Sequence, residues 1–314
     1  MTNDTFIIGS RGSDLALWQS NWVKAELEKH HPELTVEIRI IHTKGDKILD
    51  TALSKIGDKG LFTKALEDRL LDGTIDLAVH SLKDLPTILP RGLTIAAISE
   101  REDPHDVFIS KNDVTIDDLP EGAHVATGSL RRRSQLLNYR PDLNIHDLRG
   151  NVPTRVQKLQ ENDWDGLILA RAGLKRLEML DEATESIDFE IMLPAVGQGA
   201  LGLETRERDF QVKAIVAPLN DADTYAATHA ERAFLRKLEG GCQVPIGSYG
   251  KVVDGELQFR GYVGSIDGQK AVRGKGRGNP DDAESIGLRL ANELLKEGAE
   301  EILQEVRMAA ESNA

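Results

Sequence analysis

This chain has one thiol with which it could do chemistry. Cys242 is the only cysteine among 314 residues, and it lies in the segment Leu-Glu-Gly-Gly-Cys-Gln-Val-Pro that begins at Leu238. A single cysteine excludes an internal disulfide, a Cys-x-x-Cys redox pair and a multi-cysteine metal site. The two glycines before it and the proline after it predict a tight, exposed turn that presents the sulfur to a ligand. A small buried residue is the other interpretation, because a thiol is reactive only in permissive surroundings.

Arginines recur where predicted strands end and helices begin. These positions are Arg11, the run Arg131–Arg133, Arg149, Arg155, Arg171 and Arg176. Backbone N–H groups at helix N-termini favour anions, and guanidinium groups add permanently charged contacts to carboxylates or phosphates. A single arginine is more often a solvated surface charge, and a triple run also suits a nucleic-acid patch. Because the net charge is −13, we expect a cleft that binds a polyanion and no nucleic-acid partner.

A carboxylate follows a predicted buried strand in the segment 80–86, His-Ser-Leu-Lys-Asp-Leu-Pro. Asp84 would be costly at the end of such a strand unless it is paired or takes part in chemistry. A turn cap before Pro86 is the equally favoured alternative. The polar segment 45–60 is punctuated by glycines, which suits either a lid over a site or a surface loop.

Two other patterns are rejected as functional motifs. The segment 197–202, Gly-Gln-Gly-Ala-Leu-Gly, fits the dinucleotide-binding glycine pattern by its letters alone. Pro194 interrupts the preceding strand and residues 201–203 look extended, so the required strand–turn–helix context is missing. The eight histidines show no metal-binding spacing, and we therefore expect no metal site.

Strand-like and helix-like segments alternate through about the first 200 residues. Strands are predicted at 5–9, 34–41, 75–79, 93–98, 107–109, 124–126, 143–148 and 167–169, and helices at 62–71, from 130, near 156–160 and around 174–180. An early helix places Leu15, Trp18, Trp22 and Ala25 on one apolar stripe. This alternation predicts the α/β class, with sheets covered by helices and ligands bound at strand ends.

After Thr224 the pattern changes to that of a small α+β domain. A helix over 225–238 leads to the cysteine turn, and short strands follow at 252–253, 257–262 and 270–272. One long amphipathic helix then closes the chain, with Ile286, Leu290, Leu294 and Leu295 on its apolar side.

Composition places the chain among ordinary globular proteins, with 40% apolar and 29% charged residues. No apolar run approaches the length of a membrane span, so we expect no membrane partner. The first residues lack a basic region followed by an apolar stretch, which argues against a secretion signal. A free cysteine without such a signal predicts a cytoplasmic protein.

Six motifs, in order along nearly the whole chain, resemble the porphobilinogen deaminase (hydroxymethylbilane synthase) family. They are Ser-Arg-Gly-Ser from Ser10 with Leu-Ala-Leu-Trp-Gln from Leu15, the segment 80–86, Ser-Leu-Arg-Arg from Ser129, Leu-Arg-Gly-Asn-Val from Leu148, Leu-Pro-Ala-Val-Gly-Gln-Gly-Ala from Leu193, and Glu-Gly-Gly-Cys from Glu239. The resemblance implies an enzyme that condenses four porphobilinogen molecules head to tail, releases ammonia each time and frees linear hydroxymethylbilane for haem and other tetrapyrrole synthesis.

The resemblance also implies a three-domain monomer with a covalent cofactor. Residues 1–99 with 200–220 and residues 100–199 would form two periplasmic-binding-protein-like domains, and residues 221–314 the α+β domain. Cys242 would carry a dipyrromethane cofactor through a thioether bond.

The family's functional residues map onto this chain as follows. Asp84 would be the catalytic carboxylate. The cofactor would also contact Lys59, Lys83, Asp84, Thr127, Ser129, Arg131 and Arg132, with Lys55 nearby. The substrate would contact Arg11, Ser13, Gln19, Arg149, Arg155, Arg176 and Gln198.

Four positions depart from the commonest family pattern: Ala126, Gly128, Pro153 and Arg171. Gly128 lacks a hydroxyl often found there, and Arg171 replaces a usually uncharged residue.

The residues alone are also compatible with two other functions. One is a two-lobe anion-binding module without turnover, and the other is a cysteine hydrolase, for which only His80 could serve as the base.

Overall fold

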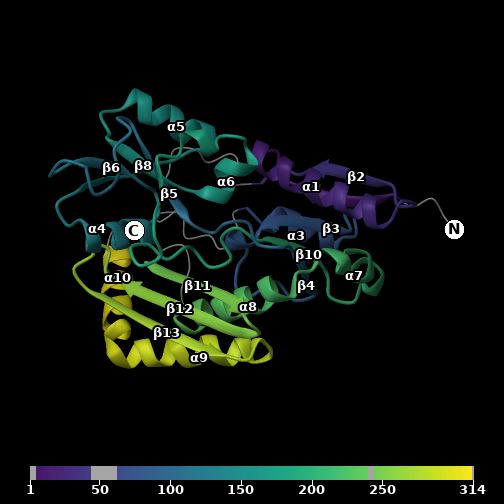
Figure 1. Ribbon diagram of the computed structural model, residues 1–314. Coiled ribbons are helices and arrows are strands. Elements are labelled where there is room, and N and C mark those ends of the chain that lie inside the picture. The colour runs from purple at the N-terminus through teal and green to yellow at the C-terminus, as the bar shows by residue number, and fades with distance from the viewer. Residues whose placement is uncertain (1–4, 44–61, 240–243, 313–314) are drawn as a thin grey trace. The chain divides into compact units, whose positions relative to one another are not determined.

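Three β-sheets organise residues 5–43, 62–239 and 244–312, which are the residues described by the computed structural model (Figure 1). The described residues of Met1–Leu49, Asp58–Glu102 and Gly199–Tyr225 form a first compact unit. Those of Asp103–Gln198 and Ala226–Ala314 form a second.

The first unit contains a mixed five-stranded sheet in the order β2-β1-β3-β10-β4. Its strands are β1 (Phe6–Ser10), β2 (Val36–Ile40), β3 (Leu77–Ser81), β4 (Leu93–Ile98) and β10 (Leu201–Arg206). β1 pairs in parallel with β2 and β3, whereas β10 runs antiparallel between β3 and β4. The extended conformation predicted for residues 201–203 is thus confirmed, and β10 joins a sheet whose other strands lie far earlier in the chain.

Helices of the first unit are α1 (Asp14–His30), α3 (Lys64–Leu71) and α7 (Phe210–Val216). The apolar stripe predicted for α1 is wrong, because the buried side chains are Gln19, Ser20, Val23 and Leu27. Trp18 is 37% exposed, and Val23 and Leu27 pack into the core with Phe6. The buried polar face arises because Gln19 makes a side-chain hydrogen bond beside the end of β3.

The second unit begins with another mixed sheet, in the order β7-β6-β8-β5-β9. Its strands are β5 (Asp106–Ser110), β6 (His124–Ala126), β7 (Asn144–His146), β8 (Gly166–Ala170) and β9 (Glu185–Ser186). β6 pairs in parallel with β7 and β8, while β5 runs antiparallel to both β8 and β9. Both five-stranded sheets therefore have the same succession of parallel and antiparallel neighbours.

The helices of this second sheet are α4 (Leu130–Tyr139), α5 (Val152–Glu161) and α6 (Arg171–Arg176). The helix predicted around residues 174–180 begins earlier and ends at Arg176. Glu178 adopts a left-handed backbone with φ 57°, which no α-helix can include, and a separate short turn follows at Leu180–Glu182.

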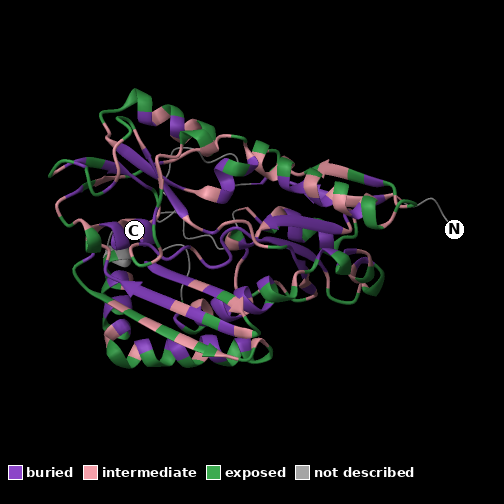
Figure 2. Cartoon of the chain, in the orientation of Figure 1, coloured by how far each residue is buried: buried purple, intermediate pink, exposed green. Residues whose placement is uncertain are grey.

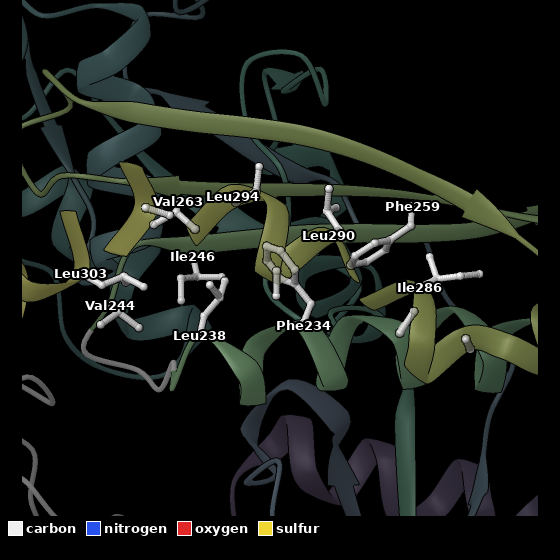
Figure 3. Packing of buried hydrophobic residues seen from close by; sticks show 14 of the residues in the cluster. Phe234, Leu238, Val244, Ile246, Phe259, Val263, Ile286, Leu290, Leu294 and Leu303 are labelled. Atoms are coloured by element: carbon white, nitrogen blue, oxygen red, sulfur yellow. The ribbon is translucent and has the colours of Figure 1, made fainter. Parts of the chain in front are cut away.

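The rest of the second unit contains an antiparallel sheet of β11 (Ile246–Val253), β12 (Glu256–Gly264) and β13 (Ala271–Gly278). Its helices are α9 (Ala283–Leu294), α10 (Glu300–Ser312) and, from Ala226 onward, α8 (Ala222–Lys237). Figure 3 shows Phe234 of α8, Phe259 of β12 and Leu290 of α9 in one core. The single closing helix predicted from the sequence is two helices, because Gly298 has φ 110° and interrupts the helical backbone. Ile286, Leu290 and Leu294 are buried as predicted.

The predicted α/β class is confirmed by the two sheets with their helices, and the smaller α+β part by the three-stranded sheet. Figure 2 shows how strongly the strands β3 and β8 are buried. Within the described ranges, no helix is both long and apolar enough to span a membrane.

Candidate functional site

A pocket in the first unit gathers four of the predicted site residues. Arg11, Ser13, Gln19 and Asp84 all line it. β1 and β3 are parallel, so their carboxyl ends meet at one edge of the sheet. Arg11 follows β1 directly, and Asp84 ends the single helical turn Leu82–Asp84 that follows β3. The topology therefore brings residues 11–19 and 84 to one place, as strand-end chemistry requires.

Each of these side chains is held in a different way. The Ser13 hydroxyl accepts a hydrogen bond from the Ala16 N–H at 3.4 Å and caps α1. The Arg11 guanidinium lies 4.3 Å from the centre of the Phe62 ring, a cation–π distance. Gln19 is almost completely buried and donates from Nε2 to Ser81 Oγ at 2.7 Å. Asp84 is exposed and Lys83, its neighbour, is half-buried.

Behind this pocket lies a buried group of titratable side chains that the sequence did not reveal. His80 also lines the pocket, and its Nε2 is 3.0 Å from Oε2 of Glu204 on β10. Glu67 on α3 is nearby, and burial raises the pKa of its carboxyl, with Glu204 adding to the effect.

In the second unit, two helices begin at the carboxyl edge of the parallel strands. Ser129 caps α4 by accepting a hydrogen bond from the Arg132 N–H at 3.4 Å. Asn151 caps α5 in the same way, with Thr154 N–H as donor at 2.9 Å. Thr127 is buried, and its N–H donates to the His146 carbonyl at 2.8 Å. Both helices thus begin at strand ends, as predicted, and free backbone N–H groups at such helix N-termini favour anions.

Arg131, Arg132 and Gln198 converge on Asp106, a residue that the sequence analysis missed. Arg131 Nη1 lies 2.6 Å from Asp106 Oδ2, and Arg132 Nη2 lies 2.7 Å from Oδ1. Gln198 Nε2 donates to Oδ1 at 2.9 Å. Burial alone raises the pKa of Asp106, but the two guanidinium groups outweigh it and hold that pKa well below its usual range. The one sequence signal was a carboxylate directly before the apolar run 107–109.

Arg149 presents a buried donor without a partner. Its Nη2 has no hydrogen-bond acceptor within the described part of the chain, and burial lowers the pKa of the guanidinium although Asp147 opposes the shift. The loop backbone around it is fixed, because Arg155 Nε donates to the Gly150 carbonyl at 2.7 Å and Lys158 Nζ to the Arg149 carbonyl at 3.1 Å. Arg176, the last residue of α6, is also buried. Arg149 thus has an unused donor for an anion.

Three of the departures from the family pattern have a structural reason. Arg171 pairs with the protein itself, since its Nε lies 3.0 Å from Asp103 Oδ2 and its Nη1 donates to Ser186 Oγ at 3.2 Å. A Cβ atom on Gly128 would lie 2.4 Å from the carbonyl oxygen of Leu148, so the loop leaves no room for a side chain there. Pro153 lies in the first turn of α5, where the helix needs no N–H donor and a proline is tolerated. The structure gives no reason for Ala126.

Three of the residues that the sequence predicts at the site lie outside the described residues, namely Cys242, Lys59 and Lys55. Within residues 5–43, 62–239 and 244–312, no group of three or more His, Cys, Asp or Glu side chains could hold a metal ion. The rejection of a dinucleotide motif at 197–202 is confirmed, because strand β10, and not a helix, begins at Leu201.

Comparison with known proteins agrees with this arrangement. Residues 6–214 match the family model described as "Porphobilinogen deaminase, dipyromethane cofactor binding domain", and residues 225–296 match "Porphobilinogen deaminase, C-terminal domain". A porphobilinogen deaminase of Carboxydothermus hydrogenoformans is 53% identical over 304 residues, which cover 97% of this chain and 98% of that protein. One of Chlorobium phaeovibrioides is 54% identical over 305 residues, 96% of this chain and 97% of that protein.

Among solved structures, the periplasmic VFT2 domain of BvgS from Bordetella pertussis aligns with 68% of this chain and 85% of its own, at 14% identity and a TM-score of 0.40. The matches to the two family models and to relatives over half identical, spanning nearly the whole chain, lead to one conclusion: the chain belongs to the porphobilinogen deaminase family.

Proposed function

We propose that Asp84, Cys242 and the basic residues described above carry the reaction that defines this family. That reaction makes the chain a transferase, hydroxymethylbilane synthase, which uses a dipyrromethane cofactor and condenses four porphobilinogen molecules into linear hydroxymethylbilane with loss of ammonia. The meeting of Asp84 with Arg11, Ser13 and Gln19 in one pocket is the observation that supports it most directly. A module without turnover, or a cysteine hydrolase, is set aside by the family membership.

The chemistry of the substrate accounts for the basic residues assigned to it in each unit. Each pyrrole ring carries an acetate and a propionate group, so every added unit brings two more carboxylates that must leave water. Arg11, Arg149, Arg155 and Arg176 would hold substrate carboxylates, because guanidinium groups bind them with charge-assisted hydrogen bonds. Ser13 and Gln19 would add neutral donors beside Arg11. Gln198 would act beside Arg131 through the network around Asp106, because its Nε2 donates to the Pro104 carbonyl at 2.8 Å and to Asp106 Oδ1 at 2.9 Å.

The residues fit an anionic cofactor as well. The unpartnered Nη2 of Arg149 and the excess positive charge of Arg131 and Arg132 over Asp106 both favour bound carboxylates. Lys59, Lys83, Thr127 and Ser129 would contribute further contacts. When attached to Cys242, the dipyrromethane would supply the primer on which the product grows.

Asp84 would act on the reacting pyrrole ring of the substrate. Loss of ammonia from porphobilinogen leaves positive charge on that ring, and a nearby carboxylate stabilises it through the pyrrole N–H. Asp84 is exposed on the pocket wall, where a substrate can reach it. This role is electrostatic, so it requires the charge of the carboxylate and not only its shape.

Intact mass spectrometry tests the proposed cofactor attachment. The purified protein should be heavier than its sequence by one dipyrromethane, and Cys242→Ser should lack that mass while it remains folded. A wild-type protein that weighs no more than its polypeptide, even after incubation with porphobilinogen, would rule out the assignment.

Steady-state kinetics test the role of Asp84. Asp84→Asn should lower kcat about 100-fold or more while porphobilinogen still binds, because a preorganised charge has been removed. Asp72→Asn is the matched control, since Asp72 is an exposed carboxylate of the same unit that pairs with Arg69 at 3.0 Å. An Asp84→Asn enzyme with undiminished kcat would reject the role.

The remaining proposals concern the molecule as a whole. We infer a cytoplasmic monomer that has no nucleic-acid partner and is divided into domains at residues 1–99 with 200–220, 100–199 and 221–314. The net charge of −13 supports the absence of a nucleic-acid partner. Sedimentation equilibrium of the purified protein tests the monomer, and a dimer mass would contradict it.

A further inference from the structure

Arg131 and Arg132 are neighbours in sequence, and yet both side chains reach one carboxylate. Arg132 gives Asp106 Oδ1 two hydrogen bonds, from Nε at 3.1 Å and from Nη2 at 2.7 Å, while Arg131 Nη1 binds Oδ2 at 2.6 Å. Each guanidinium is also tied to a backbone carbonyl, Arg131 to Leu193 at 2.8 Å and Arg132 to Ile168 at 2.9 Å. Two like charges are therefore held side by side in fixed orientations.

Strand direction explains how Asp106 comes to lie between them. β5 runs antiparallel to β8, and its first residue, Asp106, is paired with Ala170 at the end of β8. The start of β5 therefore lies at the edge where β6, β7 and β8 end, which is where the anion-binding residues are found. Asp106 is completely buried at this edge. Only a carboxylate could bind both guanidinium groups with two oxygens and also accept from Gln198 at 2.9 Å.

The charges around Asp106 do not cancel. The two arginines are 6% and 5% exposed, and one carboxylate offsets only one of their two charges. The start of α4 adds partial positive charge from its free N–H groups. A buried uncompensated charge is unfavourable, and the excess is relieved when a ligand carboxylate binds to the remaining guanidinium N–H groups.

We propose that Asp106 is a positioning residue for the condensation. It holds Arg131 and Arg132 with their remaining N–H groups available to ligand carboxylates, and it limits their joint excess to a single positive charge. The inference rests on the proposed function, since the ligand in question is the growing chain of carboxylate-bearing rings. Asp106 itself touches neither substrate nor cofactor and acts through the two arginines.

Replacement by asparagine tests the charge of Asp106. Asp106→Asn keeps the volume but turns one acceptor into a donor that faces a guanidinium, so one arginine loses its orientation. We expect kcat, counted per cofactor-loaded molecule by intact mass, to fall about 100-fold, because a displacement of roughly 1 Å in a binding group has that effect. Asp106→Glu keeps the charge on a longer side chain and should recover part of the loss.

Chemical rescue separates positioning from a structural role. Asp106→Gly leaves space for a small carboxylate between the two guanidinium groups, so sodium formate should raise its kcat in a saturable way while sodium chloride should not. Asp103→Gly is the matched control, because Asp103 pairs with Arg171 in the same unit and formate should have no effect on it. Should Asp106→Gly fail to fold, the comparison of Asp106→Glu with Asp106→Asn decides instead.

Two results would overturn the inference. One is a kcat per loaded molecule of Asp106→Asn within about threefold of wild type, with only the melting temperature lowered. The other is a loss that neither formate nor the glutamate variant recovers. The mass of the wild-type protein reports separately on the proposed function, so failure of that proposal cannot be mistaken for failure of this one.

Discussion

Replacing Arg149 should change the free energy of unfolding in opposite directions with and without the cofactor. The replacement should stabilise the cofactor-free protein and destabilise the loaded one. Its Nη2 is buried without an acceptor among the described residues, and burial lowers the pKa of the guanidinium, so the folded protein is disfavoured by this charge. Arginine remains protonated throughout the accessible pH range, so the unfavourable term is present at neutral pH. Arg149→Met keeps much of the aliphatic stem and removes the charge.

The expected magnitudes follow from that single unsatisfied group. A buried donor without a partner costs about 1–3 kcal/mol, and the shortened side chain loses roughly 1 kcal/mol of packing, so without ligand the variant should gain about 1 kcal/mol. With a ligand carboxylate present, the variant loses a charge-assisted hydrogen bond worth about 1.5–3 kcal/mol. The loop itself should persist, because the hydrogen bonds of Arg155 and Lys158 go to backbone carbonyls.

Calorimetry in two backgrounds makes this measurable. Cys242→Ser supplies the protein without cofactor, and wild type supplies the loaded enzyme. A change of about 1 kcal/mol corresponds to a shift of about 2–4 °C in the melting temperature of a unit of this size. Arg149→Met should raise the melting temperature in the first background and lower it in the second.

Arg140→Met provides the control. Arg140 is fully paired within the protein, to Asp142 at 2.8 and 2.7 Å and to the carbonyls of Ile116 and Leu119 at 2.7 and 3.0 Å. Its replacement should therefore destabilise both backgrounds equally. Equal signs for Arg149→Met in the two backgrounds would refute the view that its unused donor binds the cofactor.

Two further predictions concern stability. Burial raises the folded-state pKa of Glu67 above 4.5, so the stability contributed by its protonated form is present below pH 4.5 and is lost as the pH rises through the folded-state pKa. The melting temperature of Glu67→Gln should thus exceed that of wild type at pH 8 and approach it near pH 4, and a pH-independent difference would contradict this. In Gly287→Ala a Cβ would lie 2.2 Å from the Ala230 carbonyl oxygen. The variant should therefore be less stable, because overpacking costs about 1–3 kcal/mol and the better helix propensity of alanine contributes only about 1 kcal/mol. Urea unfolding measures the difference, and Gly276→Ala, whose Cβ would meet Ile286 at an ordinary 3.4 Å, should stay near wild type.

Hydrophobic periodicity was sufficient to predict most elements and the buried face of α9, but not the buried face of α1. The strands β3 and β8 are almost entirely buried, and their positions follow from the sequence directly. In α1 the same reasoning failed, since the helix buries Gln19 and Ser20 and exposes Trp18. A polar side chain that finds its partner on another element, as Gln19 does on Ser81, cannot be recognised from its own segment.

The sequence indicated the cationic residues of the candidate site but not its buried carboxylates. Arginines at strand ends are visible in sequence because their positions repeat. Asp106 and Glu204 gave no comparable signal, because their partners are distant in sequence. Arg131 lies 25 residues from Asp106, and His80 lies 124 residues from Glu204. Only the pairing of strands shows that these carboxylates stand next to positive or protonatable groups.

The two sheets use their antiparallel strands in a comparable way. In each sheet the strand that runs against the parallel set is the fourth in order, β10 in the first unit and β5 in the second, and each delivers one buried carboxylate. Glu204 binds His80 on the pocket wall of the first unit, and Asp106 binds Arg131 and Arg132 in the second. Asp106 lies at the edge where the parallel strands end, because it is the first residue of β5 and pairs with Ala170, whereas Glu204 pairs with Ala78 near the start of β3. Each carboxylate therefore holds a basic side chain of another element, His80 of β3 or Arg131 and Arg132 of α4. In the proposed function, substrate carboxylates would bind the positive charge that Asp106 leaves uncompensated.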